Sequence, residues 1–247
     1  MVASGRFTRL VDYFHEYSKT YEATFQLGVS TSTDDMTGEI LREASCSAVS
    51  DGDIIRALRS LEGEILQQPP AISAKRVNGE RLYDVNRGGA VVAAEPVEVT
   101  VHKIKVRKVS LPTIDVEISC GSGTYIRAIA RDVGEILGTG GAVRDLRRTR
   151  IGPYSVESAV IPDASPEPIA HLRILPERES LSLDSRKLDN LRLGRSIVLR
   201  GLDMIPGSLV RIFGDYFQTL ECLCMVVDTS TSGDSRLQPV KVFSNGQ

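Results

Sequence analysis

Hydrophobic and polar positions alternate along several short stretches of the chain, which is the pattern of a strand with one buried face. In one stretch the alternation shifts by one residue near His102–Lys103, and this shift predicts a β-bulge. Residues 110–112 then turn the chain, so we expect a hairpin. The predicted strands cover 21–29, 97–106 and 114–118.

Two other stretches carry apolar residues at helical spacing. Between about Thr124 and Leu137 they recur every three or four positions, so one face of a helix is expected to be buried, with Gly138 as its C-terminal cap. A second helix is expected to begin at Ser50 or Asp51 and to stop before the prolines at 69–70. A shorter helix is expected over 9–14. The stripe of the second helix consists of Ile54, Leu58, Leu61 and Ile65.

Prolines become frequent over 162–179, which indicates a linker. Beyond it the pattern predicts a small all-β module of roughly 65 residues, with strands at 196–199, 208–213, 216–227 and 239–243. The chain is therefore expected to be an α+β protein. Its sheet is mixed, mainly antiparallel and flanked by helices, and a boundary at 178/179 separates it from the C-terminal module.

Composition sets the class of protein. Hydrophobic residues make up 41% and charged residues 25%, which are ordinary values for a globular protein. No run approaches the ~18 apolar residues of a membrane span. The sequence predicts a cytoplasmic protein with four reduced core cysteines, no metal and no membrane segment. Cys222 and Cys224 are two apart, so a strand would place both on one face.

Charge is unevenly distributed. The whole chain has a formal net charge of −2, whereas residues 67–150 contain 14 Lys and Arg against 9 Asp and Glu. A basic middle in an acidic chain is what a focused phosphate-binding surface would show, although chance produces the same pattern fairly often. Residues 71–96 have little periodicity, and either a solvated loop or a basic arm that folds onto RNA would fit them.

Two arginines lie four apart on the helix expected over 124–137. Arg131 is predicted to form a surface pair with Glu135. Arg127 lies in the first turn, where a guanidinium can bind a carboxylate or phosphate held at the strand-to-helix junction. Asp34 and Asp35 are expected to stabilise a turn through their own backbone. The Gly121-x-Gly123 pattern is not a dinucleotide fingerprint, because Ile occupies the third glycine position.

Three motifs occur in order and together resemble one known family. They are KTYEATFQLGVSTSTDDMTGE at 19–39, QQPPAISAKRVNGERLYDVNRGG at 67–89, and GSGTYIRAIARDVGEILGTGG at 121–141 followed by LRRTRIGPY. This set resembles the TruB family of tRNA pseudouridine synthases over roughly residues 5–160. A looser similarity, beginning at LRLGRSIVL, links 179–247 to the PUA-like C-terminal module of bacterial TruB proteins.

The resemblance implies a reaction and a set of site residues. Pseudouridine synthases break the C1′–N1 bond of a uridine, turn the base and rejoin it through C5, without a cofactor or a metal. Tyr21 matches the tyrosine that stacks on the flipped base, and Arg127 matches the arginine that pairs with the catalytic aspartate. Asp35 matches an acidic residue near the pocket, and Leu146 matches an apolar residue that lines it.

The resemblance also implies an RNA-binding surface for the T arm of tRNA. Residues 67–95 would form a basic arm that holds the RNA mainly through phosphates. Lys19 falls in a matching motif position, with a less certain role. The protein is expected to act as a monomer. The further substrate-binding residues are Lys75, Arg76, Arg81, Tyr83, Tyr125, Arg147 and Arg148.

The family's nucleophilic aspartate has no counterpart in this alignment. It lies in a G-x-x-G-T-L-D-P motif upstream of the tyrosine strand, and residues 1–10 contain no Asp. A start codon placed too late or a truncated sequence, a genuine loss of the segment, and a misalignment would each explain this. We therefore expect the 247-residue chain to be inactive or nearly so. If a late start codon or a truncated sequence is the cause, the missing segment should leave an unpaired sheet edge and Arg127 without the nucleophilic aspartate as its partner. The alternative is a non-catalytic protein that binds or folds tRNA.

Overall fold

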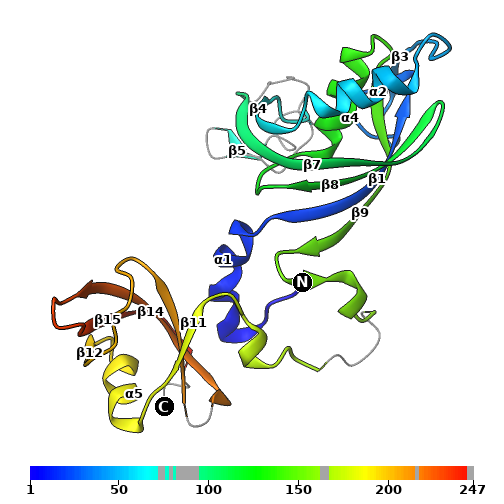
Figure 1. The fold of residues 1–247 in the computed structure, drawn as a ribbon. Coiled ribbons are helices and arrows are strands. Elements are labelled where there is room, and N and C mark those ends of the chain that lie inside the picture. Colours follow the sequence, from blue (N-terminus) through cyan, green and yellow to red (C-terminus); the bar gives the residue numbers. More distant parts are fainter. Residues whose placement is uncertain (72–75, 78–79, 82–94, 162–166, 215–216, 244–247) are drawn as a thin grey trace. The chain divides into compact units, whose positions relative to one another are not determined.

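The computed structural model describes residues 1–71, 76–77, 80–81, 95–161, 167–214 and 217–243 (Figure 1). The chain forms two compact units. One comprises Tyr13–Ala159, and the other combines Met1–Asp12 with Val160–Gln247. The second unit therefore begins before the predicted boundary at 178/179 and includes the first residues of the chain. The functional assignment of the two predicted domains stays a prediction.

The unit of residues 13–159 is built on a six-stranded antiparallel sheet with the order β10-β9-β1-β8-β7-β4. Two short two-stranded sheets accompany it, β2 with β3 and β5 with β6. The bounds are β1 Lys19–Leu27, β2 Val29–Thr31, β3 Ile40–Glu43, β4 Gly63–Gln67, β5 Arg76–Val77, β6 Glu80–Arg81, β7 Val97–Ser110, β8 Thr113–Cys120, β9 Gly141–Ile151 and β10 Tyr154–Ser155.

Helices α2 (Asp51–Arg59) and α4 (Ile126–Ile136) lie on one face of this sheet (Figure 1). Alternate residues of β1 and β8 point toward them and are buried with the apolar stripes of both helices. Burial of this face is the main favourable term for the unit. The intervening residues of β1 and β8 are polar and point to the opposite face, as the alternation predicted. The largest fully buried side chains here include Phe25, Leu27, Ile54, Ile118 and Ile129.

Several predictions from the pattern are confirmed. The strands before and after the turn at 110–112 pair as β7 and β8, and their register shifts between Val101 and Lys103, at the predicted bulge. Ser50 caps α2 in a reciprocal arrangement with Asp53. The α+β class with a mainly antiparallel sheet is the observed one.

The prediction that the helix beginning at Ser50 or Asp51 extends to Ile65 is wrong. Helix α2 ends at Arg59, and Gly63 has φ +99°, a left-handed conformation that does not continue a helix. Ile65 instead belongs to β4 and pairs with Val99 of β7. Leu61 and Ile65 still pack against the core, so their apolar character was a signal of burial rather than of helix.

The arginine-rich segment after the helix is a strand. β9 pairs with β1 along its length, including Leu146 opposite Ala23 and Arg148 opposite Tyr21. Its register shifts between Thr20 and Tyr21, which is a bulge beside the predicted tyrosine. Among the described residues, no strand pairs with the outer edge of β9 from 144 to 149. Because every open sheet has two edges, this does not test the expectation of an edge exposed by a missing segment, which stays a prediction.

Close backbone contact fixes α4 against the beginning of β9. A Cβ added at Gly134 would lie 2.1 Å from the carbonyl carbon of Gly140, and one added at Gly141 would lie 2.2 Å from the carbonyl oxygen of Ala130. The amides of Thr139 and Gly140 both donate to the carbonyl of Gly134. Only glycine allows the helix and the following turn to approach this closely.

The second unit contains a five-stranded sheet with the order β11-β13-β14-β15-β12, in which β11 and β13 are parallel. The predicted C-terminal strands are confirmed. The module also contains helix α5, which the strand pattern did not predict. The bounds are η1 Gly5–Leu10, η3 His171–Arg173, β11 Glu179–Ser182, α5 Ser185–Arg192, β12 Ile197–Leu199, β13 Leu209–Phe213, β14 Leu220–Thr229 and β15 Ser235–Val242, with α1 Val11–Glu16 and η2 Val156–Ser158 elsewhere in the chain.

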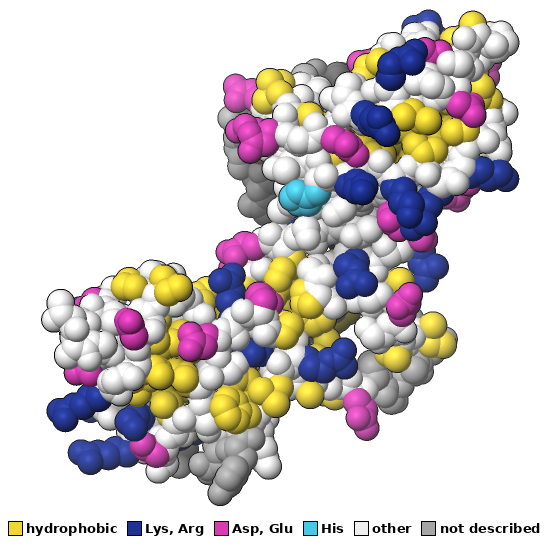
Figure 2. Space-filling model, in the orientation of Figure 1, with side chains coloured by type: hydrophobic (Ala, Val, Ile, Leu, Met, Phe, Trp, Pro, Cys, Tyr) yellow, Lys and Arg dark blue, Asp and Glu magenta, His cyan; other side chains and the backbone are white. Residues whose placement is uncertain are grey.

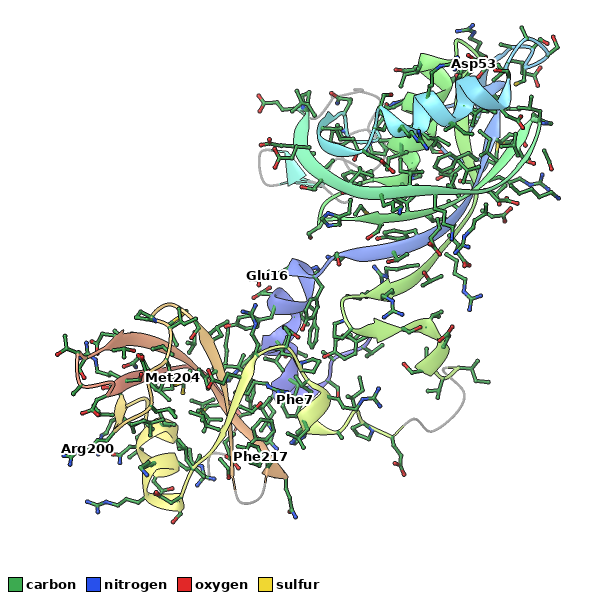
Figure 3. The ribbon with its side chains drawn as sticks, viewed as in Figure 1. Phe7, Glu16, Asp53, Arg200, Met204 and Phe217 are labelled. Carbon is green, nitrogen blue, oxygen red and sulfur yellow. The ribbon has the colours of Figure 1, made fainter. Side chains whose placement is uncertain are left out.

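The N-terminal segment packs onto this C-terminal sheet. The Phe7 ring (labelled in Figure 3) lies 5.1 Å from the ring of His171 and 5.2 Å from that of Phe243. Arg9 donates to the carbonyl of Val242, and Leu10 is buried. Phe7, Leu10 and Phe243 explain why residues 1–12 group with the C-terminal unit.

The cysteines are all free thiols. Cys222 and Cys224 lie on one face of β14, as predicted from their spacing, with sulfur atoms 3.8 Å apart in the core. No described helix is both long and apolar enough to cross a membrane.

Candidate active site at the beginning of helix α4

The first turn of α4 is held by a buried amide. Tyr125, the residue before the helix, makes no side-chain cap. Instead its N–H donates to Oε1 of Gln67 over 2.8 Å, and its carbonyl accepts from Nε2 of Gln67 over 3.1 Å. Gln67 is fully buried at the end of β4. One side chain thus satisfies two backbone groups at the helix start and ties α4 to the sheet.

Arg127 projects from this first turn to the loop that follows β2. Its Nη1 donates to Oδ2 of Asp35 and to the carbonyl of Thr33, each over 3.0 Å. Arg127 therefore pairs with an acid of its own chain, whereas the expectation that it lacks the nucleophilic aspartate as a partner stays a prediction. Tertiary structure brings Arg127 and Asp35 together, because the loop folds back along β9 and Asp35 forms an isolated β-bridge with Val143. A carboxylate at this position also faces the positive end of the helix dipole.

Arg131, one turn further along, makes a different set of contacts from the predicted one. Its Nη1 binds Oδ2 of Asp34 over 2.9 Å, and its Nη2 donates to the carbonyl of Gln68 over 2.8 Å. Nε and Nη2 also bind Oδ1 of Asp132. Glu135 lies 4.0 Å away and is largely exposed. The predicted surface pair is a marginal contact beside a partly buried network.

The two loop acids differ electrostatically. Burial acts to raise the pKa of Asp35, but hydrogen bonds from Thr37 and Thr33 and the charge of Arg127 outweigh it, so the pKa lies below its usual value. Burial raises the pKa of Asp34 above its usual value despite the charge of Arg131. Burial likewise raises the pKa of Asp132. Asp35 is therefore the firmly ionised member of the group.

Tyr21 borders the same core to which α4 contributes, so it lies on the helix-covered face of the sheet with the beginning of α4. Burial raises the pKa of its hydroxyl, and a hydrogen bond with Arg148 partly offsets this shift. Lys19, two residues earlier, is buried and donates to the carbonyl of His15 over 2.6 Å. Burial lowers the pKa of that lysine. On this same face, Leu146 of β9 is 47% exposed, so the edge beside Tyr21 presents an accessible apolar side chain.

The structure unites some predicted residues and leaves others untested. Arg127, Asp35 and Tyr125 meet at the start of α4, while Tyr21, Leu146 and Arg148 meet across β1 and β9. Arg147 lies opposite Glu22, on the polar face of the sheet, and lines a groove of about 500 Å³. Leu146 also borders this groove, and the remaining lining residues are Glu22, Ala23, Thr24, Arg107, Asp115, Val116 and Asp145. Lys75 and Tyr83 lie outside the described residues, and of Arg76 and Arg81 only the backbone pairing of β5 with β6 is described.

Charges of both signs are interspersed over the visible face of the molecule, without a continuous basic patch there (Figure 2). Within the described parts of the chain, no group of three or more His, Cys, Asp and Glu residues could hold a metal ion. Sequence reasoning missed Gln67 and Arg131. The only signal for Gln67 was a glutamine at the end of an apolar segment, directly before the basic arm.

Comparison with known proteins identifies the family. The model for the N-terminal domain of TruB family pseudouridylate synthases matches residues 1–126, and the model for the C-terminal domain of tRNA pseudouridylate synthase B matches residues 127–162. tRNA pseudouridine synthase B of Paenarthrobacter aurescens is 37% identical over 97% of this chain and 79% of its own length. The Arthrobacter sp. (strain FB24) protein of the same name is 48% identical over 62% of this chain and 52% of its length.

The fold comparison agrees. A chain in the crystal structure of a Cbf5–Nop10–Gar1 complex superposes with a TM-score of 0.67 at 21% identity, covering 98% of this chain and 71% of that one. The chain belongs to the TruB family of pseudouridylate synthases. It spans 52–64% of the lengths of the Arthrobacter, Thermobifida fusca and Clostridium tetani relatives.

Proposed function

We propose that this protein is a tRNA pseudouridine synthase that isomerises a uridine in the T loop, and that the site at the beginning of α4 is its active site. The observation that carries the proposal is the Arg127–Asp35 ion pair, on the same face of the sheet as Tyr21, in a chain of the TruB family. The protein is proposed to act as a monomer in the cytoplasm, where its tRNA substrate is.

The site residues have distinct proposed roles. The ring of Tyr21 stacks on the everted uracil, because a partly buried aromatic side chain replaces the base stacking lost on flipping. Leu146 supplies an apolar wall to the same space. Arg127 holds the attacking carboxylate through charge-assisted hydrogen bonds, and Asp35 fixes the orientation of that guanidinium.

We propose that the nucleophile is not one of the acids described at this site, because the family's nucleophile motif, upstream of the tyrosine strand, has no match in residues 1–10. Asp35 pairs with Arg127 but lies in the loop after that strand, and Asp34 and Asp132 pair with Arg131. Removing a nucleophile from an enzyme lowers its rate by ~10⁴-fold or more. We therefore propose that the 247-residue chain by itself binds the T arm and does not isomerise it.

Expression from the gene's own locus, including its upstream DNA, tests the synthase assignment. In cells whose tRNA lacks the T-loop pseudouridine, it should restore that modification, and substituting Arg127→Met should abolish it. The control is Glu135→Gln, an exposed change on the same helix, which should leave modification intact. Unmodified T-loop uridine with the wild-type gene would refute the assignment.

A second candidate is a non-catalytic tRNA-binding or tRNA-folding protein, favoured because residues 1–10 contain no match to the family's nucleophile motif. Binding of a T-arm hairpin by the 247-residue chain, measured by fluorescence anisotropy at several salt concentrations, separates the cases. Changing Lys75, Arg76 and Arg81 to Gln should lower the slope of log K against log[salt] by about 2–3, if each contacts one phosphate. Binding together with locus-dependent modification supports the enzyme. Binding without modification supports the second candidate, and no binding at low salt excludes both.

A further inference from the structure

Arg131 joins three segments that are distant in sequence. From α4 it reaches Asp34 in the loop after β2 and the carbonyl of Gln68 just beyond β4, at 2.9 and 2.8 Å. It also binds Asp132 beside it, and only 19% of its side chain is exposed. A guanidinium can bind several acceptors at once in fixed directions, which the point charge of an ammonium cannot do.

The loop after β2 binds both Arg131 and Arg127 of α4. Asp34 and Asp35 are consecutive, and they bind two arginines one helical turn apart, Arg131 and Arg127 respectively. Asp34 has φ +59°, a conformation that non-glycine residues rarely adopt and that persists only when surrounding contacts fix it. Two long-range bonds fix this residue: the backbone N–H of Val143 donates to its carbonyl, and Arg131 binds its carboxylate.

We propose that Arg131 is a positioning residue: by binding Asp34 and the carbonyl of Gln68 together, it fixes the loop so that Asp35 orients Arg127. This inference rests on the proposed function, in which Arg127 holds the reacting carboxylate. Arg131 acts only through Asp34 and the loop, because in the proposed function Tyr21 contacts the reacting base and Arg127 contacts the attacking carboxylate. Without Arg131, the loop loses its attachment to Gln68, and the direction of the Arg127 guanidinium is no longer set.

The test begins without RNA. In the full chain, carboxyl-carbon NMR follows the titration of Asp35 in the wild type, in Arg131→Lys and in Asp34→Asn. Arg131→Lys keeps the positive charge but not the three-way contact, and Asp34→Asn removes a negative charge, which by simple Coulomb effects would lower the pKa of Asp35. If the loop is released, that pKa rises toward its usual value in both variants. Glu135→Gln, the matched control on α4, should titrate as the wild type does.

The second measurement separates RNA binding from base eversion. A T-arm hairpin carries 2-aminopurine in place of the target uridine, so anisotropy reports binding and fluorescence reports eversion. In both variants we expect affinity within about threefold of the wild type and an eversion equilibrium about tenfold less favourable, which is the scale of one lost charge-assisted contact. A defect caused by general unfolding would weaken binding and eversion together, and Arg131→Lys should retain part of the eversion.

The outcomes separate the two proposals. If the wild type does not bind the hairpin, the proposed function fails, and the Asp35 titration still decides whether Arg131 positions the pair. If the hairpin binds but both variants titrate and evert the base like the wild type, the positioning role is overturned and the proposed function stands. If Arg131→Lys does not fold, Asp34→Asn decides by the same two readouts.

Discussion

Two arginines, one in each unit, hold a loop segment in place by different chemistry. In the C-terminal unit, Arg211 of β13 donates to the carbonyls of Leu172, Ile174 and Arg178 and to the hydroxyl of Ser180. In the unit of residues 13–159, Arg131 binds carboxylates as well as a carbonyl. Carbonyls and hydroxyls do not titrate between acidic and neutral pH, whereas carboxylates do.

This difference separates a structural role from a functional one. Arg211 is almost fully buried and fixes residues 171–180 against the sheet at any moderate pH. Arg131 and Arg127 remain partly exposed and balance acids whose pKa values are shifted in opposite directions. Perturbed acids next to partly exposed arginines are a feature of functional sites, although structural ion pairs can produce it too.

The largest expected effect comes from Arg211→Met. It leaves several buried acceptors without donors, and at ~1–3 kcal/mol each the free energy of unfolding of this unit should fall by about 4 kcal/mol. Urea denaturation combined with hydrogen exchange of peptides from residues 171–182 measures the loss. Arg200→Met, at an exposed arginine of the same unit (labelled in Figure 3), is the control. Wild-type protection of these peptides in the Arg211 variant would contradict the structural role.

Gly134→Ala tests the close packing of helix α4 against the beginning of β9. The added Cβ would lie 2.1 Å from backbone atoms of Gly140 and Gly141, so α4 must move away from β9. We expect a loss of about 2–3 kcal/mol in the free energy of unfolding of the 13–159 unit. Gly52→Ala in α2 is the matched control, because its nearest neighbour would be 3.5 Å away. That control should be neutral or slightly stabilising, and equal effects at the two sites would argue against the close contact.

Gln67→Leu tests whether the first turn of α4 depends on the hydrogen bonds of the buried Gln67 side-chain amide. The change leaves the N–H and the carbonyl of Tyr125 without these hydrogen bonds, and we expect a loss of about 2 kcal/mol. Gln26→Leu, a partly buried glutamine with one hydrogen bond to Leu27, serves for comparison and should cost less. Thermal unfolding followed by circular dichroism measures both, and a neutral Gln67→Leu would show that α4 is held by packing alone.

The smallest expected effect is on the pH dependence of stability. The folded-state pKa of Asp35 is lowered from 3.8, so its contribution is present above that pH and is lost as pH falls through the folded value. The folded-state pKa of Asp34 is raised from 3.8, so its contribution is present below that pH and is lost as pH rises through the folded value. Asp35→Asn should therefore flatten the acid loss of stability. Asp34→Asn removes the opposing contribution of Asp34 but also releases the loop of Asp35, so it should change the slope of stability against pH less than Asp35→Asn does. Denaturation curves between pH 3 and 6 measure both slopes, and an unchanged slope in Asp35→Asn would refute the prediction.

The sequence by itself determined the elements whose periodicity is local. The alternation over 21–29 and 114–118 became β1 and β8, and the stripe near 124–137 became α4. Motif order was also sufficient to indicate the family, and to bring Tyr21, Arg127 and Asp35 forward as site residues. These features depend on residues close together in the chain, so a linear pattern contains them.

Only the tertiary structure decided how distant segments meet. The apolar Ile65 fitted a helix equally well until pairing with β7 made it part of a strand. Arg131 had an exposed acid at the correct helical spacing, yet its main partners lie 97 and 63 residues away. Burial strengthens those long-range bonds relative to a solvated pair, because the protein interior screens charge less than water does. A short-range pattern contains no information about that difference.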